Sequence, residues 1–331
     1  APYKEVLSHG YVVDSKGEKM SKSVGNVVNP MDIINANGAD VFRLWAMTSD
    51  FKADLKLGPS NIKQVSDQYR KIRNTFRFLL GNVNPEDFDP KKDMVAYENL
   101  TEIDQFVLVA LNDVVKEVRE DVLAYDYVAA NKALMNFMVN ELSSYYCDFT
   151  KDILYCEEKD NPRRRQVQSV YWVCADKLVK LWAPFLVFTC EEVWAHFNDD
   201  AEKSVHNTEF PAVEEYPNAE EVKANAKKML DVRSTVLKAL EDARNEKMIK
   251  SNQEASIQLG VPEDVQALFS SKLDSALSQW LIVSNTEVST SEEVTVKVEK
   301  ASGTKCPRCW NYSVNPDEDD LCPRCHAVLK K

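Results

Sequence analysis

The sequence predicts a mainly helical protein, in which an antiparallel helix bundle follows a short α/β segment and precedes a small α+β unit and a cysteine-rich tail. Three observations lead to this prediction. Apolar residues recur at helical spacing through much of 59–246, segments 255–261 and 292–300 alternate as strands do, and four cysteines form two CxxC pairs near the end. The expected boundaries of the four parts are 1–57, 58–217, 218–300 and 301–331.

The composition is that of a globular protein, with 331 residues, 44% hydrophobic residues and a net charge of −12. The sequence has no apolar run of about 18 residues and no recognisable signal peptide, so we expect no contact with a membrane. Eight cysteines without a disulfide-type pattern favour a reducing compartment, the cytoplasm. The first residues, Ala-Pro-Tyr-Lys without a methionine, are typical of a segment of a longer protein.

The first part is expected to contain one strand and two helices. Val6 to Val13 predict the strand. Asn29 and Pro30 predict a helix start, because asparagine caps a helix and proline suits its first position. A second helix is expected near Asp40, which we interpret as its cap.

The bundle is expected to begin with a helix from Pro59, and this helix has two distinct faces. Its apolar face is formed by Val65, Tyr69, Ile72, Phe76 and Leu79. Arg70, Arg73 and Arg77 fall together on the opposite side, which indicates either a nucleic-acid contact or a solvated helix face.

The rest of the chain is predicted from helical periodicity and from proline and cap signals. Asp126 is a candidate cap, residues 199–218 are interpreted as a connector, and the polar stretch 285–304 as a mobile linker. The helices are expected at 102–124, 127–146, 162–182, 185–197, 219–246 and 263–279.

The tail carries the strongest local motif. Cys306 and Cys309 form one CxxC pair, Cys322 and Cys325 form the other, and 12 residues separate the pairs. Four thiolates at this spacing complete a closed tetrahedral Zn²⁺ site with a structural role. Arg308 and Trp310 are candidates for phosphate contact and base stacking. The alternatives are reduced thiols without metal and a Trp310 that packs inside the tail.

A lysine-rich loop, Glu18 to Asn26 (EKMSKSVGN), follows the predicted strand. Two lysines on a loop flanked by glycines favour binding of a polyanion, because their ammonium groups can neutralise a leaving phosphate group. A loop that is simply solvated is the alternative.

The residues Lys19-Met20-Ser21-Lys22-Ser23 are identical to the KMSKS signature of class I aminoacyl-tRNA synthetases. The segments GADVFRLWAMTSDF and YRKIRNTFRFLLGNV and the CPRCW…CPRC tail resemble the isoleucyl members more than the valyl or leucyl ones. The resemblance extends over nearly the whole chain and is weak in 200–300.

This resemblance implies that the chain is the C-terminal third of an enzyme that activates isoleucine with ATP and Mg²⁺. By carry-over, Lys22 would contact ATP, and Lys19 with Lys22 would stabilise the departing pyrophosphate, which makes this pair catalytic. Met20, Ser21 and Ser23 would complete the ATP-binding loop. The family's HIGH signature and its editing domain are absent from this sequence, so we expect no activity from the chain alone.

The resemblance further implies that residues 1–57 belong to a Rossmann-like catalytic domain and that the bundle is of the anticodon-binding type. The expected partner is isoleucine tRNA, with Arg70, Arg73, Arg77, Arg308 and Trp310 as contact residues, and the protein is expected to be a monomer. Three alternatives remain. They are a fragment of another class I synthetase such as the valyl one, a stand-alone zinc-dependent tRNA-binding module, and a helical scaffold whose zinc site only fixes its C-terminus.

Overall fold

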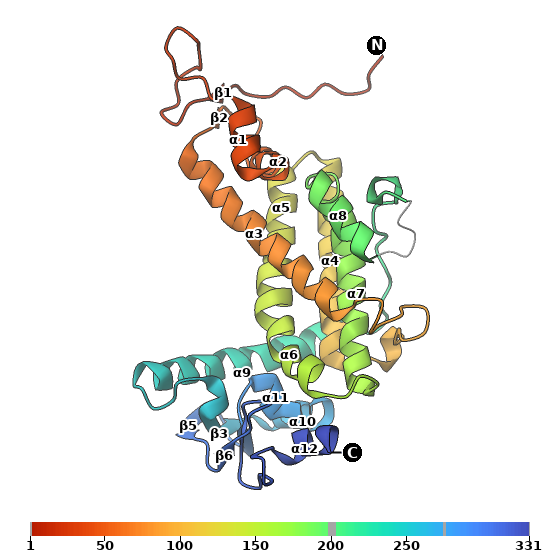
Figure 1. Cartoon of the computed structure of the whole chain (residues 1–331), viewed down its shortest axis with the longest axis vertical. Helices are drawn as coiled ribbons and strands as arrows, with labels where there is room; N and C mark the ends of the chain where they lie inside the picture. Colours follow the sequence, from red (N-terminus) through yellow and green to blue (C-terminus); the bar gives the residue numbers. More distant parts are fainter. Residues whose placement is uncertain (1, 198–202, 274–275, 331) are drawn as a thin grey trace. The chain divides into compact units, whose positions relative to one another are not determined.

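The computed structural model describes residues 2–197, 203–273 and 276–330 (Figure 1). Its contacts divide the chain into two compact units. Unit 1 comprises residues 1–87, 110–143 and 171–214, and unit 2 comprises residues 88–109, 144–170 and 215–331. The predicted mainly helical class with small sheets is confirmed. The four predicted domain boundaries stay predictions, and part of the predicted connector, residues 198–202, lies outside the described residues.

The start of unit 1 contains less strand than predicted. Only Val12–Val13 form a strand, β1, which pairs in parallel with β2 (Leu55–Lys56). Most residues before it are exposed, so they gain no apolar burial from an extended pairing. Helix α1 (Pro30–Asn37) starts as predicted, because the Asn29 side chain accepts a hydrogen bond from the Met31 N–H.

Asp40 is not the cap of the second helix, α2 (Ala39–Met47), whose N-cap is Gly38. The Asp40 carboxylate instead accepts hydrogen bonds from the backbone N–H of Thr189 at 2.7 Å and from its hydroxyl at 2.6 Å. These groups lie in the first turn of α8 (Val187–Phe197), where four N–H groups lack helical partners. Asp40 therefore caps a helix that is distant in sequence.

Helix α3 (Pro59–Asn82) has the predicted apolar face. Val65, Ile72, Phe76 and Leu79 are buried, Tyr69 is half-buried, and the helix contacts α2 and α8. Most of the other predicted helices are present as well. They are α4 (Glu102–Leu123), α5 (Tyr127–Asn136), α7 (Pro162–Trp182) and α9 (Ala219–Asn245), and Asp126 caps α5 as predicted.

One helix was not predicted. The helix expected over 127–146 ends as α-helix at Asn136, continues as a π-helical stretch (Phe137–Tyr146), and is followed by α6 (Cys147–Cys156). A π-helix has more residues per turn than an α-helix, so the apolar spacing no longer follows the α-helical period there. Short 3₁₀ turns lie at Tyr97–Asn99, Val205–Asn207 and Asn252–Glu254.

Unit 2 contains a three-stranded sheet with β3 (Ala255–Val261) in its centre. Strand β4 (Asn285–Thr290) pairs with it in parallel and β5 (Thr295–Lys300) antiparallel, while α9 and α10 (Glu263–Lys272) contact the sheet. The interpretation of 285–304 as a mobile linker is therefore wrong, because most of it is strand. The helix predicted over 263–279 is also interrupted: α10 ends at Lys272, and α11 covers only Leu277–Leu281.

The tail folds as a small hairpin followed by a helix. Strands β6 (Thr304–Lys305) and β7 (Tyr312–Ser313) pair antiparallel, and α12 (Pro323–Leu329) closes the chain. Gly303, with φ of 94°, lies where a Cβ atom would come within 2.2 Å of the Ser313 carbonyl oxygen. Within the described residues, no helix is both long and apolar enough to cross a membrane.

Candidate functional site

The lysine loop is closed at its base by two polar side chains. Asp14 accepts hydrogen bonds from the backbone N–H groups of Lys16 and Glu18 and, at 3.0 Å, from the Asn26 amide. Asn26 in turn accepts the Ser21 N–H at 2.9 Å and donates to the Lys19 carbonyl at 3.3 Å. The Asn26 hydrogen bond is the largest cause of the lowered pKa of the Asp14 carboxyl. The two ends of the loop are thus joined, and the tip between them is a turn in which the Gly25 N–H donates to the Ser21 carbonyl at 3.1 Å.

Both loop lysines are exposed. Lys19 forms a bridge with Val13 through its backbone, and its ammonium lies 5.8 Å from the Tyr11 ring centre. Lys22 lies at the tip of the loop. Met20 and Ser21 are half-buried, and the hydroxyls of Ser21 and Ser23 lie 3.2 Å apart. The structure therefore presents the two ammonium groups to solvent from a backbone that its own side chains fix.

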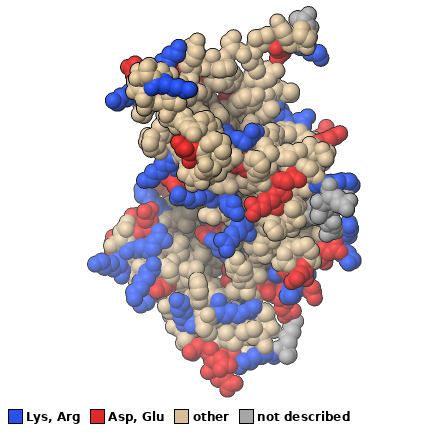
Figure 2. Space-filling model, turned by 45° about the horizontal axis from the view of Figure 1, so that its top comes forward, with Lys and Arg blue, Asp and Glu red and all other residues tan. Residues whose placement is uncertain are grey.

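The predicted arginine face of α3 is also exposed, but its members differ. Arg70 pairs with Asp67 at 2.8 Å on the same helix. Arg73 reaches Glu192 on α8 at 3.4 Å, and its pKa is raised, first by the Tyr69 hydroxyl. Arg73 and Arg77 line one pocket of about 600 Å³ beside α8. Figure 2 shows that basic side chains are spread over much of the visible face and are interrupted by acidic ones.

The four tail cysteines come together as predicted. Their sulfur atoms all lie within 4.8 Å of one another, and all four residues are buried. Cys306 accepts the Trp310 N–H through its carbonyl at 3.0 Å, which closes the first knuckle. Four thiolates at about 2.3 Å from a zinc ion would lie about 3.8 Å apart, so this cluster fits Zn²⁺ with little movement.

A fifth cysteine belongs to the same buried cluster. Cys156, at the end of α6, is 4% exposed and was given no role from the sequence. Burial raises the pKa of its thiol to about 12. Its sulfur is not part of the group of four whose sulfur atoms all lie within 4.8 Å of one another, so it is not a fifth candidate ligand.

The arginines of the two CPRC motifs both turn toward α6. Arg324 donates to both carboxylate oxygens of Asp152, at 2.6 and 2.7 Å. Burial acts to raise the pKa of Asp152, but the hydrogen bonds and charge of Arg324 lower it overall. Arg308 donates to the Tyr155 carbonyl at 3.4 Å. The predicted phosphate contact of Arg308 is untested, and the structure gives this residue an anchoring contact.

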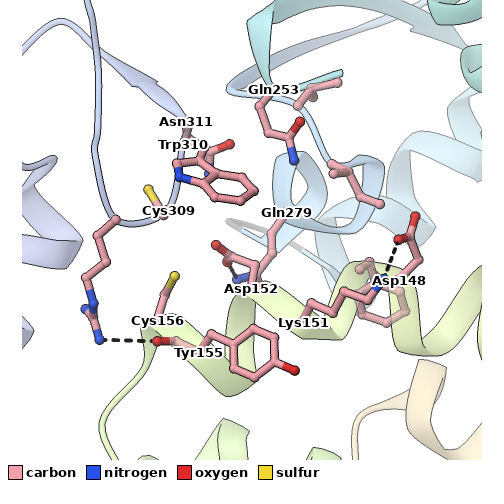
Figure 3. A pocket seen from close by; sticks show the side chains of 14 residues that line it. Asp148, Lys151, Asp152, Tyr155, Cys156, Gln253, Gln279, Cys309, Trp310 and Asn311 are labelled. Carbon is pink, nitrogen blue, oxygen red and sulfur yellow. Dashed lines mark hydrogen bonds and ion pairs between the residues drawn. The ribbon is translucent and has the colours of Figure 1, made fainter. Parts of the chain in front are cut away.

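Trp310 does not pack inside the tail. Its side chain is 60% exposed, its backbone is left-handed with φ of 66°, and Lys305 lies 5.9 Å from the ring centre. It lines a pocket together with residues of α6 and α11 (Figure 3). Of the two interpretations of Trp310, base stacking and packing inside the tail, the exposed side chain favours base stacking.

Sequence reasoning missed several residues that shape these sites. Asp14 and Asn26 were not singled out, although both flank the lysine motif and are residue types that hydrogen-bond to nearby backbone. Asp152 and Tyr155 gave no signal at all, because their partners in the tail lie more than 150 positions away.

Three family models match the chain. They are "Anticodon-binding domain of tRNA ligase" over residues 104–259, "tRNA synthetases class I (I, L, M and V)" over 1–58, and "Zinc finger found in FPG and IleRS" over 303–328. The first covers much of the helical region, the second contains the lysine loop, and the third contains all four tail cysteines. Together with the cluster geometry, the last match supports a structural zinc ion in the tail.

The chain is also similar to complete proteins. The isoleucine–tRNA ligase of Bacillus licheniformis is 44% identical over 345 residues, and that of Shouchella clausii is 43% identical over 344 residues. These alignments cover 100% and 99% of this chain but only 37% of either relative. Among solved structures, a LeuRS–tRNA–LeuAMS complex from Agrobacterium radiobacter gives a TM-score of 0.44 at 19% identity, over 76% of this chain and 26% of that one.

Proposed function

Because the chain belongs to the isoleucine–tRNA ligase family of class I aminoacyl-tRNA synthetases, we propose that it is the C-terminal portion of such an enzyme. The whole enzyme activates isoleucine with ATP and transfers it to isoleucine tRNA in the cytoplasm, as a monomer. Within it, this chain supplies the KMSKS loop over 1–57, the anticodon-binding bundle over 58–217, the junction over 218–300 and the zinc module over 301–331.

The lysine loop is the observation that carries this proposal. Its base is closed by Asp14 and Asn26, and the ammonium groups of Lys19 and Lys22 stand free in solvent. Lys22 contacts the ATP phosphates, and both lysines stabilise the negative charge that grows on the departing pyrophosphate. Mg²⁺ bound to ATP neutralises part of the same charge. Contacts that strengthen as this charge develops raise the rate of activation rather than the affinity for ATP.

The second role of the chain is to bind tRNA. The exposed arginines of α3 contact phosphates, and the zinc module with Trp310 contacts unstacked bases. The match of residues 104–259 to an anticodon-binding domain supports this role. A negative net charge is compatible with it because basic side chains are spread over the face in Figure 2.

The test is binding of the zinc-loaded chain to isoleucine tRNA and to valine tRNA across a salt series. We expect preference for isoleucine tRNA and loss of this preference in Cys306→Ser. Arg70→Glu with Arg73→Glu should weaken binding and flatten its salt dependence, because fewer counterions are released. The Glu substitutions are compared with Arg244→Glu, an exposed arginine at the end of α9. Equal binding of both tRNAs would contradict the proposed recognition.

The activation role requires the rest of the enzyme. We expect no isoleucine-dependent pyrophosphate exchange from this chain alone, because it spans 37% of the relatives' length. In the full-length enzyme, Lys22→Ala should lower kcat far more than it changes the KM for ATP. A pure rise in KM would show that the lysine binds ATP in the ground state only.

A further inference from the structure

One pocket of unit 2 has no role in the function proposed so far. Its volume is about 470 Å³, which is in the range of small-ligand sites. Its walls come from α6, α11, the turn before β3 and the first cysteine knuckle (Figure 3). All of these elements belong to one compact unit.

Two aromatic rings border this pocket, and both are available to a ligand. Trp310 and Tyr155 are each 60% exposed, so both rings present apolar surface at the rim of the pocket. The Trp310 ring is held there by the knuckle, because its backbone N–H donates to the carbonyl of Cys306 at 3.0 Å. Tyr155 is carried by α6, which also anchors Arg308 through its own backbone carbonyl. A planar ring of a ligand can stack on the ring of Trp310 or on that of Tyr155.

Three of the four charged side chains that line the pocket, all except Arg308, are held in ion pairs. Lys151 lies 3.2 Å from Asp148, and Asp152 is held by Arg324 from outside the lining. The lining carries two acidic and two basic side chains, so its formal charge sums to zero and does not by itself select a phosphate group or another anion. Its ligand is a neutral group, and phosphates of the same ligand stay outside.

The remaining polar groups favour the edge of a planar ring. In Figure 3 the Gln253 side chain points toward the space between Trp310 and Tyr155, and Asn311 lies beside Trp310; each amide offers both a donor and an acceptor. Arg308 also lines the pocket, and its Nη1 atom is buried without a hydrogen-bond partner. An unpaired buried donor is unfavourable, so a ligand that brings an acceptor atom relieves that cost.

We propose that this pocket binds a single unstacked nucleobase of the tRNA, stacked against Trp310 and Tyr155 and hydrogen-bonded along its edge. The proposal rests on the proposed tRNA binding and adds the site, its residues and the class of base. Arg308 can only donate, so the base presents an acceptor atom to it; we assign this acceptor as a carbonyl oxygen, which guanine, uracil and cytosine carry, whereas adenine offers ring nitrogens only. Gln253 and Asn311 contact the same edge.

The experiment combines changes in the protein with changes in the RNA. Isoleucine tRNA transcripts, each with one loop nucleotide made abasic, are titrated against the wild-type chain, Tyr155→Ala and the control Tyr3→Ala. Tyr3 is 61% exposed and lies in the other unit, so it matches Tyr155 in residue type and exposure. Tyr155→Phe keeps the ring and should bind as the wild type does. Zinc content is measured for each variant to confirm that the tail is folded.

We expect one loop position at which the abasic nucleotide weakens wild-type binding about tenfold, as loss of a stacked base does. At that position the same change should weaken binding to Tyr155→Ala by less than about twofold, because the interaction is already lost. Adenine at this position should bind more weakly than the other bases, and Gln253→Ala should lower the discrimination.

If the abasic nucleotide and Tyr155→Ala weaken binding independently of each other at every loop position, the pocket proposal is wrong, although tRNA binding itself stands. Adenine bound as well as guanine would overturn the assignment of Arg308. If Tyr155→Ala loses its zinc, the Gln253→Ala titration decides: an abasic nucleotide that weakens binding to this variant as much as to the wild type at every loop position overturns the proposal. A wild-type chain that binds no tRNA at all would refute the proposed function and this inference together.

Discussion

Replacing Arg324 should release the zinc module from α6. In Arg324→Ala, the two charge-assisted hydrogen bonds to Asp152, at 2.6 and 2.7 Å, are lost. Asp152 then keeps a carboxylate that is only 23% exposed, with the side chains of Gln279 and Cys156 as its remaining hydrogen-bond partners among the described residues. An exposed ion pair contributes about 0.2–1 kcal/mol, whereas breaking a buried pair costs about 3–5 kcal/mol. The partial exposure of this pair places the cost at about 2 kcal/mol.

Because the chain has two compact units, a local measurement is needed. Hydrogen exchange of the amides in 304–329 reports the opening of the module directly. A loss of about 2 kcal/mol corresponds to exchange that is about thirtyfold faster. Arg324→Lys should be intermediate, since lysine keeps the charge but cannot make the two-pronged contact.

Lys330→Ala is the matched control, because its side chain is as exposed as that of Arg324, at 33% against 32%, but its partners are acids of the tail itself. It should change exchange by less than about threefold. The anchoring of the zinc module by Arg324 is refuted if amide exchange in the tail is as slow in Arg324→Ala as in the wild type. It is equally refuted if the control opens the module to the same extent, since general charge loss would then explain the effect.

The remaining predictions concern the metal, the core and the hairpin. Removing zinc with a chelator should unfold 303–329, seen as a change in Trp310 fluorescence that Trp310→Phe lacks; an unchanged spectrum contradicts a structural ion. Asp104→Ala should lower the free energy of unfolding by about 3 kcal/mol in urea titrations, because the buried Asp104 accepts hydrogen bonds from Tyr146 at 2.6 Å and from Arg163 at 3.0 Å. A cost below about 1 kcal/mol would show that water replaces these bonds. Gly303→Ala should weaken zinc retention about tenfold in chelator competition, since its Cβ would lie 2.2 Å from a carbonyl oxygen; normal retention would show that the hairpin shifts freely.

The helices were predictable where apolar spacing follows the α-helical period without interruption. The helix from Pro59 shows this, with Ile72, Phe76 and Leu79 buried as expected. The helix predicted over 127–146 is helical throughout, but the sequence does not indicate that its second half is π-helical, nor that α6 follows it. The sequence of strand β4 (NTEVST) is polar and resembles a linker. Its extended state depends on pairing with β3 rather than on its own composition, so composition alone does not predict it.

The candidate sites likewise contain parts that the sequence predicts and parts that it does not. Motifs with fixed local spacing, the CxxC pairs and the lysine loop, lead directly to a sulfur cluster and to two exposed ammonium groups. Contacts between distant segments could not be seen in the sequence, as with Arg324 and Asp152. Asp40 shows the limit most clearly, because a residue that looks like a local cap stabilises the start of a helix near position 189.

The joined base of the lysine loop has a consequence for the entropy of binding. Residues between Asp14 and Asn26 are already held in one arrangement by hydrogen bonds from both ends. A loop that must become ordered when phosphates arrive loses conformational freedom of about 1–2 kcal/mol for each residue fixed, and that loss is subtracted from the affinity. Here only the flexible side chains of Lys19 and Lys22 remain to be fixed, so most of the Coulombic attraction is left for the reacting phosphates.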